Sequence, residues 1–230
     1  MSDPLENIIY ISVPEDLDRT IGDFHLDPDI MLPVESTSGT DRYDIHDLAW
    51  EQILAAMLKI LAYNPEHDDA DYYREFVMTV RPDIIDELTQ TAILKARNRE
   101  FELAEEIFRA LSGLQPNEQR PLINLALLYE ERSNSASDRG NEQAAQEFAE
   151  QAFSIYHEIM EMDDVLPEAH LNAGYFHLRQ RNYDRARAHL ETYQESGDDA
   201  EKKREIAKII SDIDSQNLLD TLFKEAYDFI

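Results

Sequence analysis

Histidine and carboxylate side chains that lie close together in the sequence are the first candidates for chemistry. His67-Asp68-Asp69 is followed closely by Asp71, and imidazole and carboxylate groups together can ligate a divalent metal. The cluster comes directly after a Pro-Glu pair, where a loop is expected. A solvated acidic turn is the better interpretation of these residues, and we predict no metal site.

The remaining sequence contains no recognisable catalytic or ion-binding motif. Neither a Gly-rich phosphate loop nor a nucleophile elbow is found. Asp16-Leu17-Asp18 with Gly22, and Asp212-Ile213-Asp214, lack the other positions of an EF-hand. The chain has no cysteine, which excludes disulfides and thiolate chemistry. We expect a protein that is not an enzyme, with no catalytic residue, cofactor or metal.

The charge of the chain limits its partners. The formal net charge is −28, from 49 acidic and 21 basic residues. Like charges repel, so DNA, RNA and anionic membranes are not expected partners. A neutral or basic protein is favoured, although acidity also simply maintains solubility. The absence of a basic leader and of a run of about 18 apolar residues predicts a cytoplasmic protein.

Residues 1–43 are predicted to form an acidic, irregular N-terminal arm. Prolines and glycines spaced through them prevent a sustained helical period. Two apolar stretches stand out, Ile8–Val13 and Phe24–Val34. The first is β-branched and suits an extended strand. Two interpretations remain: a disordered arm, or an arm that docks within the chain on the helices that follow.

Helical periodicity begins near Asp44 and predicts a degenerate helical hairpin over residues 44–82. Asn64-Pro65 should end its first helix and Pro82 its second, because the residue before a proline avoids the helical conformation. Beyond the hairpin, we expect further helical pairs over residues 83–196.

A repeated pattern organises residues 83–196. Ala104, Phe108 and Leu111 have the same spacing as Ala186, Leu190 and Tyr193. The last three follow Leu171-Asn172-Ala173-Gly174-Tyr175. This pattern resembles the tetratricopeptide repeat (TPR), a 34-residue helical hairpin. In one register the units are 83–116, 117–164 and 167–196. Ala152 lies 34 residues before Ala186 but 48 after Ala104, so the middle unit is 14 residues longer. Its polar stretch Ser133–Asn141 is predicted to be a loop.

The resemblance implies an all-α fold, a right-handed α-solenoid of TPR-like hairpins. Small residues, including Gly174 and Ala186, would let the two helices of a unit approach closely. His170 and His177 fall on packing positions of the third unit, so we interpret them as core histidines rather than ligands. Residues 197–230 are predicted to form C-terminal capping helices that close the array, with Asp198 or Asp199 at the start.

In this family, the first helix of each unit lines a concave groove that binds partners. Carried over by position, the candidate groove residues here are Ile93, Arg97, Arg120, Ile123, Asn124, Leu127, Leu171, Asn172, Tyr175, Leu178 and Arg179. Family members that bind chaperone C-termini use five basic or amide positions, here Thr89, Ile93, Asn124, Glu168 and Asn172. Only Asn124 matches, which argues against that ligand.

We therefore predict a non-enzymatic adaptor that binds a protein or peptide segment through the groove. Two other functions remain open: a chaperone for a basic or aggregation-prone client, and a structural subunit of a larger assembly. The residues do not distinguish these functions, because each would use a helical-repeat surface.

Overall fold

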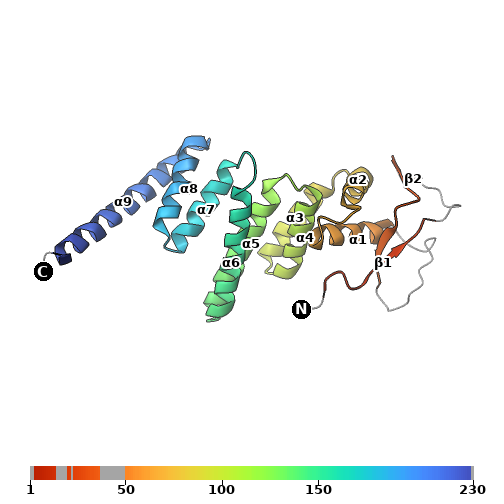
Figure 1. The fold of residues 1–230 in the computed structure, drawn as a ribbon, viewed down its shortest axis with the longest axis horizontal. Coiled ribbons are helices and arrows are strands. Elements are labelled where there is room, and N and C mark those ends of the chain that lie inside the picture. Colours follow the sequence, from red (N-terminus) through yellow and green to blue (C-terminus); the bar gives the residue numbers. More distant parts are fainter. Residues whose placement is uncertain (1–2, 14–19, 22, 37–49, 229–230) are drawn as a thin grey trace. The chain divides into compact units, whose positions relative to one another are not determined.

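A computed structural model describes residues 3–13, 20–21, 23–36 and 50–228, with side chains as far as residue 215. The chain folds as two compact units, residues 1–128 and 129–230. Helices make up most of the described residues, and consecutive helices pack as pairs, which agrees with the predicted all-α class (Figure 1). No helix in the described ranges has the length and apolar character that a membrane span requires.

In the part of the first unit that the structure describes, there are four complete helices and the start of a fifth. They are α1 (Trp50–Tyr63), α2 (Ala70–Val80), α3 (Ile84–Arg97), α4 (Phe101–Leu114) and α5 (Gln119–Asp138), whose last part lies in the second unit. Helix α1 stops one residue before Asn64-Pro65, and α2 stops just before Pro82, as the prolines predict. The start predicted near Asp44 lies outside the described residues.

The N-terminal residues that the structure describes form short strands. Strand β1 (Ile8–Ile11) pairs antiparallel with β4 (Leu32–Glu35), and β2 (Thr20–Ile21) pairs with β3 (Phe24–His25). Pro33 cannot donate a ladder hydrogen bond and is tolerated because, among the described residues, β1 and β4 form a two-stranded sheet in which each strand has a free edge. The structure thus differs from the predicted irregular arm, because these residues pair with each other.

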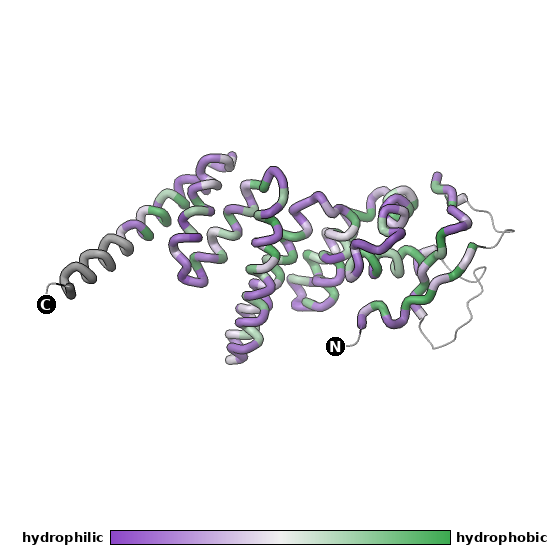
Figure 2. Tube along the Cα trace, viewed as in Figure 1, coloured by the Kyte–Doolittle hydropathy of each residue, from purple (hydrophilic) through white to green (hydrophobic). Residues whose placement is uncertain are grey.

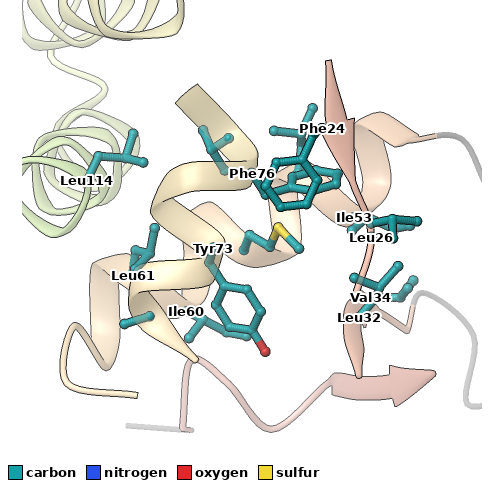
Figure 3. Close-up of a cluster of buried hydrophobic side chains, with 14 of the residues drawn as sticks. Phe24, Leu26, Leu32, Val34, Ile53, Ile60, Leu61, Tyr73, Phe76 and Leu114 are labelled. Atoms are coloured by element: carbon teal, nitrogen blue, oxygen red, sulfur yellow. The ribbon is translucent and has the colours of Figure 1, made fainter. Parts of the chain in front are cut away.

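These strands cover helices α1 and α2. Leu26, Leu32 and Val34 are fully buried in one cluster with side chains of both helices, as Figure 3 shows. The ring of Phe24 meets that of Phe76 edge to face, with centroids 5.0 Å apart. Lys59 of α1 also forms an ion pair with Glu35. Burying each large apolar side chain stabilises the fold by about 1.5–3 kcal/mol, so this part of the arm belongs to the core of the first unit.

Helix α1 is apolar along much of its length (Figure 2) because it is covered on several sides. Besides the strands and α2, it packs against α4. The two backbones approach so closely at Gly113 that a Cβ atom there would lie 2.1 Å from the carbonyl oxygen of Leu61. Arg74 of α2 also holds α4 at this point, since its Nε donates to the carbonyl of Gly113 at 2.7 Å.

The second unit contains the end of α5 and four further helices. They are α6 (Glu142–Met160), α7 (Pro167–Arg179), α8 (Tyr183–Ser196) and α9 (Ala200–Asp228). The predicted loop Ser133–Asn141 is wrong for its first six residues, because α5 remains helical as far as Asp138; only residues 139–141 lie outside the helices. Ser135 and Ala136 are buried, and the Ser133 hydroxyl donates to the carbonyl of Ala145 at 2.8 Å. This burial and the hydrogen bond to α6 outweigh the weak helix propensity of serine and asparagine.

Small residues lie buried where the repeat register places them. A Cβ atom on Gly174 of α7 would lie 2.6 Å from Cδ2 of Leu190 on α8, so the two helices are in close contact. The alanines of the matching positions are fully buried: Ala104, Ala126, Ala152 and Ala186. This is the packing that the pattern predicts for paired helices.

One continuous helix, α9, follows where capping helices were predicted. Asp199 begins it, and its Oδ1 accepts from the backbone amides of Glu201 and Lys202, each at 2.9 Å. Ile206 and Ile213 are buried. The helix therefore packs one apolar side against the other helices of the second unit, and α8 is its principal neighbour.

Candidate functional site

The groove residues predicted in the first unit differ in exposure. Arg97 on α3 and Arg120 on α5 are exposed, while Ile93 and Asn124 are half-buried. Ile123 is buried, so it serves the core and cannot form part of a binding floor. The remaining predicted residue, Leu127 on α5, is 39% exposed although the next residue, Leu128, is buried.

The groove residues predicted in the second unit are engaged in contacts of their own. Leu171 packs against the cluster of Leu190, Tyr193 and Ile206, so it is part of the junction with α9. The Tyr175 hydroxyl donates to Glu205 of α9 at 3.1 Å. Burial and this carboxylate raise the pKa of Tyr175. Helix α9 thus occupies part of the surface that the pattern assigned to a partner.

Asn172 and Leu178 of α7 are half-buried. Arg179 at the end of the same helix is paired with Glu130, a buried carboxylate of α5. The Tyr156 hydroxyl of α6 donates to the other oxygen of Glu130 at 2.7 Å. One carboxylate therefore links three helices. Burial raises the pKa of Tyr156 and lowers that of Arg179, and the ion pair satisfies a charge that would otherwise be costly to bury.

Three histidines meet between α7 and α8. The Nδ1 atoms of His170 and His189 lie 3.1 Å apart, so one ring donates and the other accepts. The rings of His177 and His189 stack, with centroids 5.5 Å apart and planes 8° apart. Burial lowers the pKa of all three, and the charges of the other two and of Arg185 help to lower that of His189 to about 4.

His177 is buried and His170 half-buried, in agreement with the packing role that the register predicts for them. Sequence reasoning missed His189, because no local spacing relates it to His170. Only the pairing of α7 with α8 brings these rings together. Within the described ranges, no group of three or more histidine, aspartate or glutamate side chains is arranged to hold a metal ion.

The other histidine-carboxylate cluster also has a structural role. The backbone N–H of Asp69 donates to Nδ1 of His67 at 3.1 Å, so the ring proton is on Nε2 and points to the Tyr10 oxygen, also at 3.1 Å. His67 therefore connects β1 with the start of α2. Both ring nitrogens of His67 therefore take part in hydrogen bonds within the fold.

A hollow that the sequence pattern did not predict opens between α6, α7 and α8. Its volume is about 190 Å³, and its floor is formed by Ala149 and three rings, those of Phe153, Phe176 and His177. Arg185 and Glu150 lie at its rim with three side-chain amides. Phe153 lies on α6 between the buried residues Ala152 and Tyr156 but is itself exposed. An aromatic residue at such a position outside the buried face was the one sequence feature that could have indicated the hollow. A polar rim around an aromatic floor can bind one side chain or a small molecule.

Comparisons with known proteins assign this chain to no family: no family model matches it, and neither a curated protein nor a solved structure shows significant similarity. The resemblance to tetratricopeptide repeats therefore depends on the residue pattern of this chain and on the burial of its small residues.

Proposed function

We propose that the protein is a non-enzymatic adaptor of the cytoplasm that binds a neutral or basic protein segment through the first helices of TPR-like hairpins. The observation that supports this most is the burial of the small residues of the repeat register, above all Gly174 against Leu190. Hairpins that pack in this way cannot bury their apolar faces alone, so they form arrays. The helix faces that the array leaves exposed are then available to partners.

Helix α5 carries the clearest binding surface of the first unit. Leu127 is 39% exposed, and Asn124, one turn earlier, has a half-buried amide able to hydrogen-bond a peptide backbone. Arg120 is exposed at the start of the same helix and forms no ion pair with any residue that the structure describes. Arg120 lies about two turns before Leu127 on the same helix, and arginine is among the residue types enriched where binding energy concentrates.

The experiment that tests this proposal compares Leu127→Asp with a matched control, Leu103→Asp. Leu103 lies on α4, outside the predicted groove, and is 49% exposed, so both leucines lose a similar amount of apolar surface. Tagged full-length protein captures partners from native lysate, and mass spectrometry quantifies them. We expect at least one protein to be captured equally by the unchanged chain and by the control. The Leu127→Asp variant should capture at least tenfold less of that protein, which corresponds to a loss of binding free energy on the order of 1.4 kcal/mol or more.

Tyr175→Asp is unsuitable for this test because Tyr175 already bonds Glu205, so an aspartate would destabilise the α9 junction. Circular dichroism checks that both leucine variants keep their helix content. If no protein depends on Leu127, the proposed groove on α5 is refuted.

A further inference from the structure

The hollow of the second unit has the size and lining of a pocket for one large apolar side chain. Among its floor residues, Phe153 is 40% exposed, and Phe176 and His177 are buried. The His177 ring meets Phe153 edge to face at a centroid distance of 6.0 Å, so the floor is a continuous aromatic surface. An apolar cavity of about 150 Å³ holds benzene. A hollow of about 190 Å³ therefore has room for one aromatic ring or one leucine.

The charged groups at the rim determine what accompanies that side chain. The Arg185 guanidinium lies 5.6 Å from the centre of the Phe153 ring, so its positive charge is held beside the hollow. Arg185 is exposed and pairs with no carboxylate among the described residues. The neighbouring arginine of α8 differs, since Arg187 pairs with Glu191 and Asp214, both at 3.1 Å.

Glu150 is the opposing charge at the rim. Its Oε1 accepts a hydrogen bond from the Gln146 amide at 2.9 Å, and its side chain is exposed to solvent. Water and this amide stabilise the carboxylate without a cation. Arg185 has no such partner and lies against an aromatic face, where a guanidinium is held in place but not neutralised. The hollow therefore complements an apolar group that carries a negative charge.

We propose that this hollow is an anchor pocket for a phenylalanine- or leucine-sized side chain of a bound protein segment, with a carboxylate next to it in that segment pairing with Arg185. The proposal rests on the proposed function in taking a protein segment as the occupant. It assigns a site on α6, α7 and α8 that does not overlap the predicted groove residues. The net charge of the chain favours a neutral or basic partner overall. At this pocket, the bound segment of that partner would carry one carboxylate.

Short peptides test the pocket without knowledge of the natural partner. The probes are Gly-Phe-Asp-Gly, blocked at both ends, and its counterparts with asparagine or lysine in place of aspartate. Binding to the isotope-labelled full chain is followed by nuclear magnetic resonance at about 0.15 M salt, where the Debye length is about 8 Å and the distant acidic residues are screened. One anchored side chain predicts dissociation constants that are roughly millimolar.

We expect the aspartate peptide to bind about two- to fivefold more tightly than the asparagine peptide, as for an exposed ion pair. The lysine peptide should bind most weakly. Chemical shifts should change at Phe153, His177 and Arg185. Arg185→Gln should abolish the preference for aspartate but keep the binding of the ring, and Phe153→Ala should weaken all three peptides. Arg139→Gln, which removes an exposed arginine at the α5–α6 turn, is the matched control and should change nothing.

Two results would overturn the proposal. Equal or tighter binding of the lysine peptide would show that Glu150 dominates the rim. Absence of shifts around Phe153 up to about 10 mM peptide would show that the hollow is not a site. Either result leaves the test of Leu127 untouched, so failure of the pocket and failure of the adaptor function can be told apart.

Discussion

Replacing Gly113 by alanine tests the closest approach of two helices in the first unit. The new Cβ would lie 2.1 Å from the carbonyl oxygen and 2.6 Å from the carbonyl carbon of Leu61, against an ordinary contact of 3.4–4 Å. The obstacle is the backbone of α1, which cannot rotate away as a side chain can. Helix α4 must therefore move away from α1, and the bond from Arg74 to the Gly113 carbonyl must lengthen or break.

The expected cost follows from three contributions. An extra methyl group in a packed core costs about 1–3 kcal/mol, and a lost hydrogen bond from a charged donor costs about 1.5–3 kcal/mol. The higher helix propensity of alanine returns about 1 kcal/mol. We expect the free energy of unfolding to fall by about 2–4 kcal/mol. The two penalties do not add in full, because a shift of α4 that breaks the hydrogen bond also relieves the crowding. With a urea dependence near the middle of the usual range, about 2 kcal/mol per molar, the unfolding midpoint should fall by roughly 1–2 M.

Urea unfolding followed by circular dichroism measures the midpoint, and hydrogen exchange locates the effect in α1 and α4. Two glycine controls separate crowding from backbone effects. Gly174→Ala meets mainly the Leu190 side chain, which can rotate, so its cost should be smaller. Gly140→Ala meets nothing within 4 Å, but its φ of 74° costs a side chain about 1–2 kcal/mol. A neutral or stabilising Gly113→Ala would refute the close packing of α1 on α4.

Three further predictions concern stability. Leu26→Ala should cost about 2–5 kcal/mol and accelerate amide exchange in β4 and α1, because Leu26 is fully buried; exchange confined to the strands would show that the arm is not part of the core. Glu130→Gln and Arg179→Gln should each destabilise the second unit, and a double-mutant cycle should give a coupling of about 1–3 kcal/mol; additivity would refute the ion pair. The pKa of His189 is lowered to about 4 in the folded chain, so the unfolded chain binds more protons between about pH 6.5 and 4, and stability should fall as pH decreases through that window. His189→Phe should reduce that dependence, measured by urea midpoints.

Local patterns in the sequence determined the class of the fold and many helix ends. Asn64-Pro65 and Pro82 stop helices wherever they stand, since proline restricts the residue before it. The positions of Gly174 and the small residues of its register follow from a periodicity visible in the chain itself. Such features depend on residues a few positions apart, so they can be read without knowledge of the fold.

The candidate sites were predicted only in part. The register placed Arg97, Arg120 and Leu127 on exposed faces of their helices, as the structure has them. It could not show that Ile123 is buried in the core or that Glu205 reaches Tyr175 from α9. Exposure depends on which neighbour covers a helix face, and the repeat pattern describes the helix without its neighbours.

Only the tertiary structure decided which distant segments meet. Leu26 enters the core beside α1 and α2, and His189 stands against His170, although no sequence period relates these positions. The stretch Ser133–Asp138 is helical against the preference of its own residues for a loop: Ser135 and Ala136 are buried, and the Ser133 hydroxyl donates to the Ala145 carbonyl of α6. The hollow beside Phe153 exists because residues of three helices line it. Burial and electrostatic contact act between side chains that are close in space, and their partners are set by packing rather than by spacing along the chain.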